Sequence, residues 1–204
     1  MRPLAGLVIA YLAGSIPFAY LAGKLFKGID LREHGSGNLG ATNVFRVMGW
    51  KIASLVMVLD MAKGAVPVLL LPPRFAPAHA ELWAIAFGVA AIVGHVRSVF
   101  LLWKGGGKGV ATAGGVFLAL APIASLISIA VFALVVSLSG YVSLGSLCSA
   151  VVLTVAVVIL KGASSPVAIA CAMITVFVFW THRANIGRLR RGEENRFRRA
   201  RPAA

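Results

Sequence analysis

Charged residues are scarce in this chain, and acidic residues are the scarcest of them. Only 13% of the 204 residues are charged, and Asp and Glu together number 6. A soluble domain usually has about 25% charged residues. Because 59% of the chain is hydrophobic, its surplus apolar surface requires a bilayer. The composition therefore excludes a soluble domain of useful size beside the apolar segments.

Cysteine is also rare. The chain has 2 cysteines, Cys148 and Cys171, and each lies inside an apolar run. Neither their number nor their spacing fits a disulfide framework or a metal site. The sequence therefore predicts no metal.

Basic residues dominate what charge there is, with 20 Lys and Arg and a net charge of +14. Such a balance can indicate nucleic-acid binding, but here the cations gather in short loops beside apolar runs and in the C-terminal tail. That distribution is typical of the cytoplasmic side of a membrane protein. We expect no nucleic-acid partner, and we expect the arginines from Arg190 to Arg201 to anchor the tail at anionic lipid.

The apolar runs predict an all-α polytopic membrane protein with about seven transmembrane helices. The first run is too long for a signal peptide and is followed by Lys24 and Lys27, so we expect a retained helix. The run 110–121 is too short to cross a core of about 30 Å, which indicates a half-helix or fusion with the next run. The expected spans are roughly 3–23, 52–71, 81–102, 110–121, 123–138, 142–160 and 166–181.

Three basic segments interrupt these runs, at 24–51, at 97–108 and from 181 onward. If all three face the cytoplasm, the N-terminus lies outside and the basic tail 183–204 lies inside. The chain then forms one membrane domain over 1–204.

The first polar loop contains a literal G-x-G-x-x-G at Gly35, Gly37 and Gly40. A dinucleotide fold needs a preceding strand and an acid about 20 residues later. Here an apolar run precedes the loop, and the next acid, Asp60, lies in another apolar run. Exposed backbone N–H groups and polar side chains instead favour a phosphate site over a plain turn. The side chains are Ser36, Asn38, Thr42, Asn43 and Arg46.

The second basic segment contains a glycine loop, residues 105–109, which surrounds Lys108. It is not a Walker A motif, because Leu102 occupies the position of the first glycine and Gly109 that of the Ser or Thr. A glycine loop that opens onto an apolar helix is nevertheless a good anion cradle. The alternative is a flexible turn with snorkelling lysines.

Two further groups of residues are candidates. His182, Asn185 and Arg188 would share one face if the last helix continued past residue 181. Asp60 and Lys63 lie inside the second span, where charges usually have a function. As neighbours of opposite charge they are equally well explained as a structural pair, and both interpretations stay open. His34 and His95 are weaker candidates.

Five segments together resemble a known family. They are GSIPFAYL (14–21), GSGNLGATNVFR (35–46), LDMAKG (59–64), the GH…KGGGKGVAT segment (94–112) and HRANIGRLRRGEE (182–194). They resemble the acyl-phosphate:glycerol-3-phosphate acyltransferases, the PlsY family, in the right order over essentially the whole chain. The resemblance implies a metal-independent, seven-helix enzyme of the bacterial inner membrane without a cofactor. Such an enzyme transfers a fatty acyl group from acyl phosphate to the 1-hydroxyl of glycerol 3-phosphate on the cytoplasmic side. The product is lysophosphatidic acid, and the reaction is the first step of bacterial phospholipid synthesis.

The resemblance also assigns roles. His182, Ser36 and Asn185 are expected to be catalytic. The expected substrate-binding residues are Arg46, Lys108, Lys104, Gly105, Gly106, Gly107, Asn38, Thr42 and Asn43. The chain departs from the family pattern in having three glycines before Lys108 instead of two and Ser98 in place of proline. The extra glycine leaves the roles of Lys104 and Lys108 open.

Acyl transfer requires an oxyanion hole, which the backbone N–H groups of the glycine loops would provide. The proton acceptor is either His182 or an oxygen of the substrate phosphate. We expect the cationic neighbours Arg183 and Arg188 to make His182 a weak acceptor, which favours the phosphate. An acyl-enzyme at Ser36 is a third possibility. A transporter for a phosphorylated solute is the rival class, but no internal repeat is present and the polar groups gather on one side of the membrane.

Overall fold

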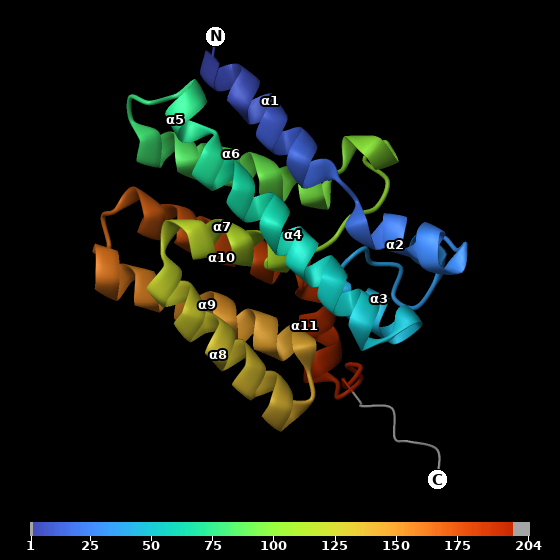
Figure 1. Ribbon diagram of the computed structural model, residues 1–204. Coiled ribbons are helices and arrows are strands. Elements are labelled where there is room, and N and C mark those ends of the chain that lie inside the picture. The colour runs from blue at the N-terminus through green and yellow to red at the C-terminus, as the bar shows by residue number, and fades with distance from the viewer. Residues whose placement is uncertain (1, 198–204) are drawn as a thin grey trace. The chain divides into compact units, whose positions relative to one another are not determined.

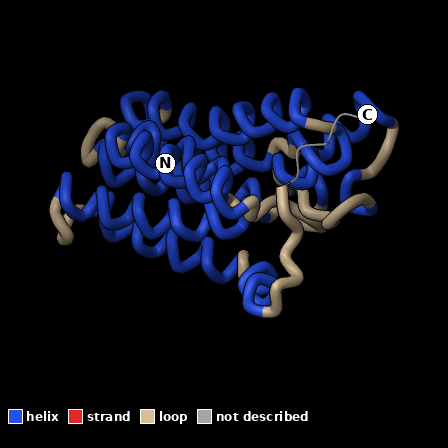
Figure 2. Tube along the Cα trace, turned by 90° about the horizontal axis from the view of Figure 1, so that it is seen from below, coloured by secondary structure: helices blue, strands red, loops and turns tan. Residues whose placement is uncertain are grey.

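The computed structural model describes residues 2–197, and all regular structure in that part of the chain is helical (Figure 2). Five helical segments are long and apolar enough to cross a membrane, or up to six if a bent pair counts as one span. The protein is therefore a helical integral membrane protein, as the composition predicted. The number of seven crossings, the orientation of the termini and the single domain over 1–204 stay predictions.

The chain forms two compact units, residues 1–120 and 121–204. In the first unit α1 packs along α6, and α4 packs along α7 (Figure 1). The helices of this unit are α1 (Arg2–Ser15), α2 (Phe18–Lys27), η1 (Leu31–Glu33), α3 (Ala41–Met48), α4 (Trp50–Leu70), α5 (Pro72–Phe75), α6 (Ala80–Val96), η2 (Val99–Leu101) and α7 (Val110–Leu120).

In the second unit α8 and α9 form an antiparallel hairpin, and α10 packs against α9 (Figure 1). Its helices are α8 (Pro122–Ser139), α9 (Val142–Lys161), α10 (Pro166–Thr181) and α11 (Arg183–Arg190). Proline begins both α8 and α10, where its missing N–H costs nothing. Part of the basic tail, residues 198–204, lies outside the described residues.

The first span is broken at Pro17. Proline cannot donate a backbone hydrogen bond, so α1 ends at Ser15 and α2 begins at Phe18. Side chains from elsewhere in the first unit bind the carbonyl groups at the break. Ser98 Oγ donates to the Ser15 carbonyl at 2.5 Å, and Lys63 Nζ donates to the Ile16 carbonyl at 2.7 Å.

The short fourth run is a helix of 11 residues, α7. At 1.5 Å per residue its length is about 16 Å, roughly half of a 30 Å hydrocarbon core. This length agrees with the expectation of a half-helix. The end of the last run differs from a simple continuation, because α10 and α11 meet at an angle of 60° at His182.

A small apolar core lies beneath the first polar loop. Leu31, Leu39 and Val44 of the loop and α3 are buried against side chains of α2 and α4. Burial of each such side chain contributes roughly 1.5–3 kcal/mol. The core fixes the loop between the two spans, and so it positions the polar groups that the sequence singled out.

Candidate active site

The side-chain amide of Asn43 organises the first polar loop. Its Oδ1 accepts a hydrogen bond from the backbone N–H of Ser36 at 2.8 Å. Its Nδ2 donates to the carbonyl groups of His34 at 2.9 Å and Leu31 at 3.4 Å. Asn43 is 1% exposed. Since its amide is used within the loop, Asn43 supports the site from below, and its predicted contact with substrate stays a prediction.

Two glycines of the loop are required by its shape. Gly35 and Gly37 have φ of +63° and +68°, which is the left-handed region that glycine adopts at no steric cost. A Cβ on Gly35 would lie 2.3 Å from Asn43 Oδ1, and one on Gly37 would lie 2.9 Å from the Arg32 carbonyl oxygen. The motif that resembles a dinucleotide fingerprint is therefore a compact turn that ends at α3.

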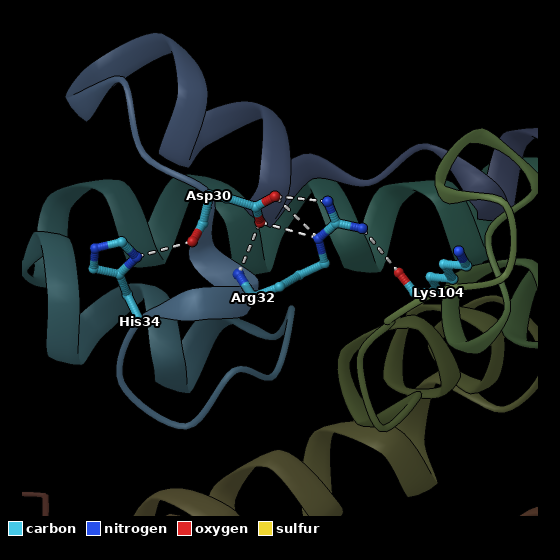
Figure 3. A network of polar contacts seen from close by, with 4 residues as sticks. All are labelled: Asp30, Arg32, His34 and Lys104. Carbon is cyan, nitrogen blue, oxygen red and sulfur yellow. Dashed lines mark hydrogen bonds and ion pairs between the residues drawn. The ribbon is translucent and has the colours of Figure 1, made fainter.

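Arg32 joins this loop to the glycine loop (Figure 3). Its guanidinium holds the Asp30 carboxylate at 2.6 Å and donates to the Lys104 carbonyl at 3.2 Å. The Arg32 side chain lowers the pKa of Asp30 to about 2, and Asp30 in turn raises the pKa of Arg32. The pair therefore stays ionised at physiological pH, so the hydrogen bond from Arg32 to Lys104 does not depend on pH in that range.

A second connection runs through Gly106. Its carbonyl accepts hydrogen bonds from Asn38 Nδ2 at 3.2 Å and from the Leu39 N–H at 3.3 Å. Gly105 and Gly109 have φ of +92° and +84°, and α7 begins directly after Gly109. The two glycine-rich segments, far apart in the sequence, thus form one continuous polar surface beside the start of a helix.

The predicted binding residues of this surface differ in exposure. Ser36, Arg46 and Lys104 are exposed, whereas Asn38, Thr42 and Lys108 are half-buried. The exposed cations near the glycine turns are accessible to an anion from solution. An Arg side chain also offers two parallel N–H groups to a phosphate. The arrangement is suited to binding a phosphorylated solute.

The third segment belongs to the second unit and contains the bend at His182. His182 is 3% exposed and lies between α10 and α11. Its ring Nδ1 lies 2.8 Å from the carbonyl oxygen of Val178. A carbonyl can only accept, so Nδ1 carries a proton.

Glu194 holds the rest of this segment together. Its carboxylate accepts hydrogen bonds from Asn185 Nδ2 at 2.7 Å, Ser143 Oγ at 3.0 Å and Arg188 Nε at 2.7 Å. Burial raises the pKa of Glu194, but the three donors outweigh burial and leave that pKa below its ordinary value. Asn185 and Arg188 share a face of α11, as their spacing predicted, and this face is directed at Glu194.

The two arginines next to His182 have partners of their own. Arg183 donates to the Trp180 carbonyl at 3.1 Å and stacks 4.8 Å from the centre of the Trp180 ring. Arg188 is paired with Glu194. The partners of Arg183 are neutral groups that leave its charge uncompensated, whereas the charge of Arg188 is paired, and the expected weakening of His182 as a proton acceptor stays a prediction.

Asp60 and Lys63 form an ion pair at 2.8 Å inside the first unit. His95, which the sequence ranked as a weak candidate, joins them with its Nδ1 3.6 Å from Asp60 Oδ1. The two residues are therefore paired, and the pair has a third member.

Sequence reasoning missed the supporting residues. Asp30, Arg32 and Glu194 make the principal ion pairs of the three segments, but loop charges in a basic chain have no distinctive pattern. The sequence offered one indication, which is that acidic residues are rare. With 6 acids in the chain, a carboxylate inside a motif segment is a good candidate for a specific ion pair.

The fold and this surface define a helical integral membrane protein with a polar surface that is rich in glycine and bears cations. The profile of the family described as "Glycerol-3-phosphate acyltransferase" matches residues 4–192. The chain therefore belongs to that family and is an acyltransferase.

Individual relatives agree. The glycerol-3-phosphate acyltransferase of Maridesulfovibrio salexigens is 47% identical over 95% of this chain and 96% of its own. That of Solidesulfovibrio magneticus is 47% identical over the full length of both chains. The crystal structure of PlsY (YgiH) in its glycerol 3-phosphate form superposes with a TM-score of 0.87, at 38% identity over 97% of this chain and 96% of that one. The lysophosphatidic acid form of PlsY (YgiH) gives 0.84 and 36%, over 96% and 95%.

Proposed function

We propose that this enzyme transfers a fatty acyl group from acyl phosphate to the 1-hydroxyl of glycerol 3-phosphate, giving lysophosphatidic acid and inorganic phosphate. The main support for this proposal is the polar surface that the two glycine-rich segments form, joined by the hydrogen bonds of Arg32 and of Gly106. A structure 38% identical to this chain is a glycerol 3-phosphate form, and one 36% identical is a lysophosphatidic acid form. Both support the same acceptor and product here.

The reaction forms an ester bond between the acceptor hydroxyl oxygen and the acyl carbonyl carbon, and it breaks the bond from that carbon to the phosphate oxygen. Negative charge develops on the carbonyl oxygen, which backbone N–H groups of the glycine loop stabilise. Arg46, Lys104 and Lys108 bind phosphate oxygens of the acceptor and the leaving group. Ser36 orients the acceptor hydroxyl through a hydrogen bond, and the resemblance to the family gives Asn185 a catalytic role as well.

The hydroxyl proton goes to an oxygen of the substrate phosphate. His182 is the rival acceptor, but its Nδ1 is bound to the neutral Val178 carbonyl. Histidines that act as strong bases usually have a carboxylate at this nitrogen to stabilise the imidazolium. Glu194, in the same segment, accepts hydrogen bonds from Asn185, Ser143 and Arg188. We therefore favour the substrate phosphate as the proton acceptor and assign His182 to binding and orienting substrate.

The proposed setting is the bacterial inner membrane, with seven crossings, the N-terminus outside and the site on the cytoplasmic side. Three basic segments support this orientation, because cytoplasmic loops are enriched in Lys and Arg. In that setting a soluble phosphate arrives from the cytoplasm and the acyl chain of the donor stays in membrane lipid. The domain extends over residues 1–204.

The donor is tested by comparing acyl phosphate with an acyl thioester of the same chain length, using purified protein and glycerol 3-phosphate. We expect lysophosphatidic acid only with acyl phosphate, because a thiolate leaving group presents no phosphate to the cations of the site. Comparable rates with the thioester would refute the assignment of the donor while leaving the acceptor unchanged.

A further inference from the structure

We propose that Asp60, Lys63 and His95 form a buried positioning network that holds the glycine loop 105–109 in its substrate-binding conformation. This inference rests on the proposed function, since it concerns how the same site is held. The three side chains are 2%, 4% and 5% exposed. Charged groups this deeply buried within membrane spans are costly, and they usually serve a function.

One side of the network closes the break in the first span. Lys63 Nζ lies 2.8 Å from Asp60 Oδ1 and donates to the Ile16 carbonyl at 2.7 Å. Its ammonium also lies 5.4 Å from the centre of the Phe18 ring. Lys63 therefore ties α4 to the junction of α1 and α2, and Asp60 compensates its charge.

The other side of the network lies under the glycine loop. His95 is in the last turn of α6, and its carbonyl accepts a hydrogen bond from the Gly107 N–H at 3.3 Å. A Cβ on Gly107 would lie 2.0 Å from His95 Nε2, and one on Gly106 would lie 2.2 Å from the Val96 carbonyl oxygen. The loop backbone thus rests directly on the imidazole ring and on the end of α6.

Asp60 sets the orientation of that ring. Its Oδ1 is 3.6 Å from His95 Nδ1, so the carboxylate attracts the Nδ1 edge and places the Nε2 edge against Gly107. Rotation of the ring would move Nε2 and remove the surface on which residues 106 and 107 pack. Because Gly106 also accepts from Asn38 and Leu39, a displaced Gly106 would separate the two halves of the site.

The test uses steady-state kinetics of the purified full-length enzyme with four variants. Asp60→Leu removes the carboxylate, and Asp60→Asn keeps an oxygen that can accept from His95. His95→Asn keeps a donor near the Nδ1 position but removes the ring edge under Gly107. Ser128→Ala is the matched control, because it removes a buried 2.8 Å hydrogen bond to the Ser149 carbonyl in the second unit.

We expect Asp60→Leu and His95→Asn to raise the KM for glycerol 3-phosphate at least tenfold, and Asp60→Asn to raise it less. The control should leave KM unchanged. A network that only stabilises the fold would lower the melting temperature and the amount of active enzyme at constant KM. That pattern in both Asp60→Leu and His95→Asn would overturn the proposal.

Hydrogen–deuterium exchange gives a second measurement that does not depend on activity. Amides of residues 105–109 should exchange faster in His95→Asn and in Asp60→Asn than in the wild type and in Ser128→Ala. Unchanged exchange would overturn the proposal even if Asp60→Leu fails to fold. If the wild type itself makes no lysophosphatidic acid, the proposed function fails, and the exchange comparison still decides whether the network positions the loop.

Discussion

Replacement of His182 by an amide separates substrate orientation from proton acceptance. In His182→Asn the amide nitrogen can take the place of Nδ1 and keep the 2.8 Å hydrogen bond to Val178. The bend between α10 and α11 should therefore survive. What is lost is one hydrogen bond from the ring to substrate, which amounts to roughly 1.5–3 kcal/mol when the partner is charged, or about 10–150-fold in kcat/KM. A general base would instead lose about 10²–10⁴-fold, mostly in turnover.

The assay is a pH–rate profile of wild type, His182→Asn and His182→Gln, with lysophosphatidic acid as the measured product. We expect the better amide to retain substantial activity, with the loss shared between KM and kcat. The acidic limb should persist, because a phosphate monoester ionises near pH 6 by itself. His79→Asn is the control: His79 is exposed and has φ of +57°, which Asn tolerates. If the limb disappears in an amide variant that is folded and still binds substrate, His182 is the base.

Three further predictions concern binding, stability and topology. Arg46→Ala should raise the KM for glycerol 3-phosphate and lower turnover, a combined loss in kcat/KM on the order of 2–3 kcal/mol. Arg46→Lys should restore activity only in part, because an ammonium lacks the two parallel N–H groups of a guanidinium. Unchanged steady-state kinetics in Arg46→Ala would exclude Arg46 from the site. Glu194→Gln places an amide N–H among three donors and should lower the melting temperature at pH 7. The pKa of folded Glu194 is depressed, so its contribution to stability is complete above the ordinary value of about 4.3 and is lost as pH falls through the folded value. The difference in melting temperature between Glu194→Gln and wild type should therefore shrink below pH ~4. A difference that stays constant with pH would contradict this. Reporter fusions after Ala78 and after Arg201 should report opposite sides of the membrane, and the same side for both would refute the charge argument.

The sequence predicted the helices of the second unit closely. The expected runs 123–138, 142–160 and 166–181 correspond to α8 (Pro122–Ser139), α9 (Val142–Lys161) and α10 (Pro166–Thr181). The reason is physical: Pro122 and Pro166 can begin a helix but cannot lie within one without loss. The bend at His182 was not predictable in this way, because residues 181–190 contain no proline.

The site was predicted by residue type and only partly by role. Glycines, Asn38 and the cations lie on the surface that the motifs indicated, since chains poor in polar groups concentrate them where they are needed. Asn43 differs, because its amide is buried in the loop, and burial depends on tertiary packing that a motif does not encode. The connections through Arg32 to Lys104 and from Glu194 to Asn185 span loops, so no local periodicity could reveal them.

Acyl transfer from acyl phosphate to glycerol 3-phosphate can be distinguished from transport by the stoichiometry of the reaction in detergent, where no gradient can exist. Purified protein is mixed with acyl phosphate and glycerol 3-phosphate, and lysophosphatidic acid and inorganic phosphate are measured together over time. We predict that both appear at equal rates in the wild type, and that both appear at least tenfold more slowly in Arg46→Ala at low glycerol 3-phosphate. Release of phosphate without formation of lysophosphatidic acid, or no turnover by a folded wild type, would contradict it.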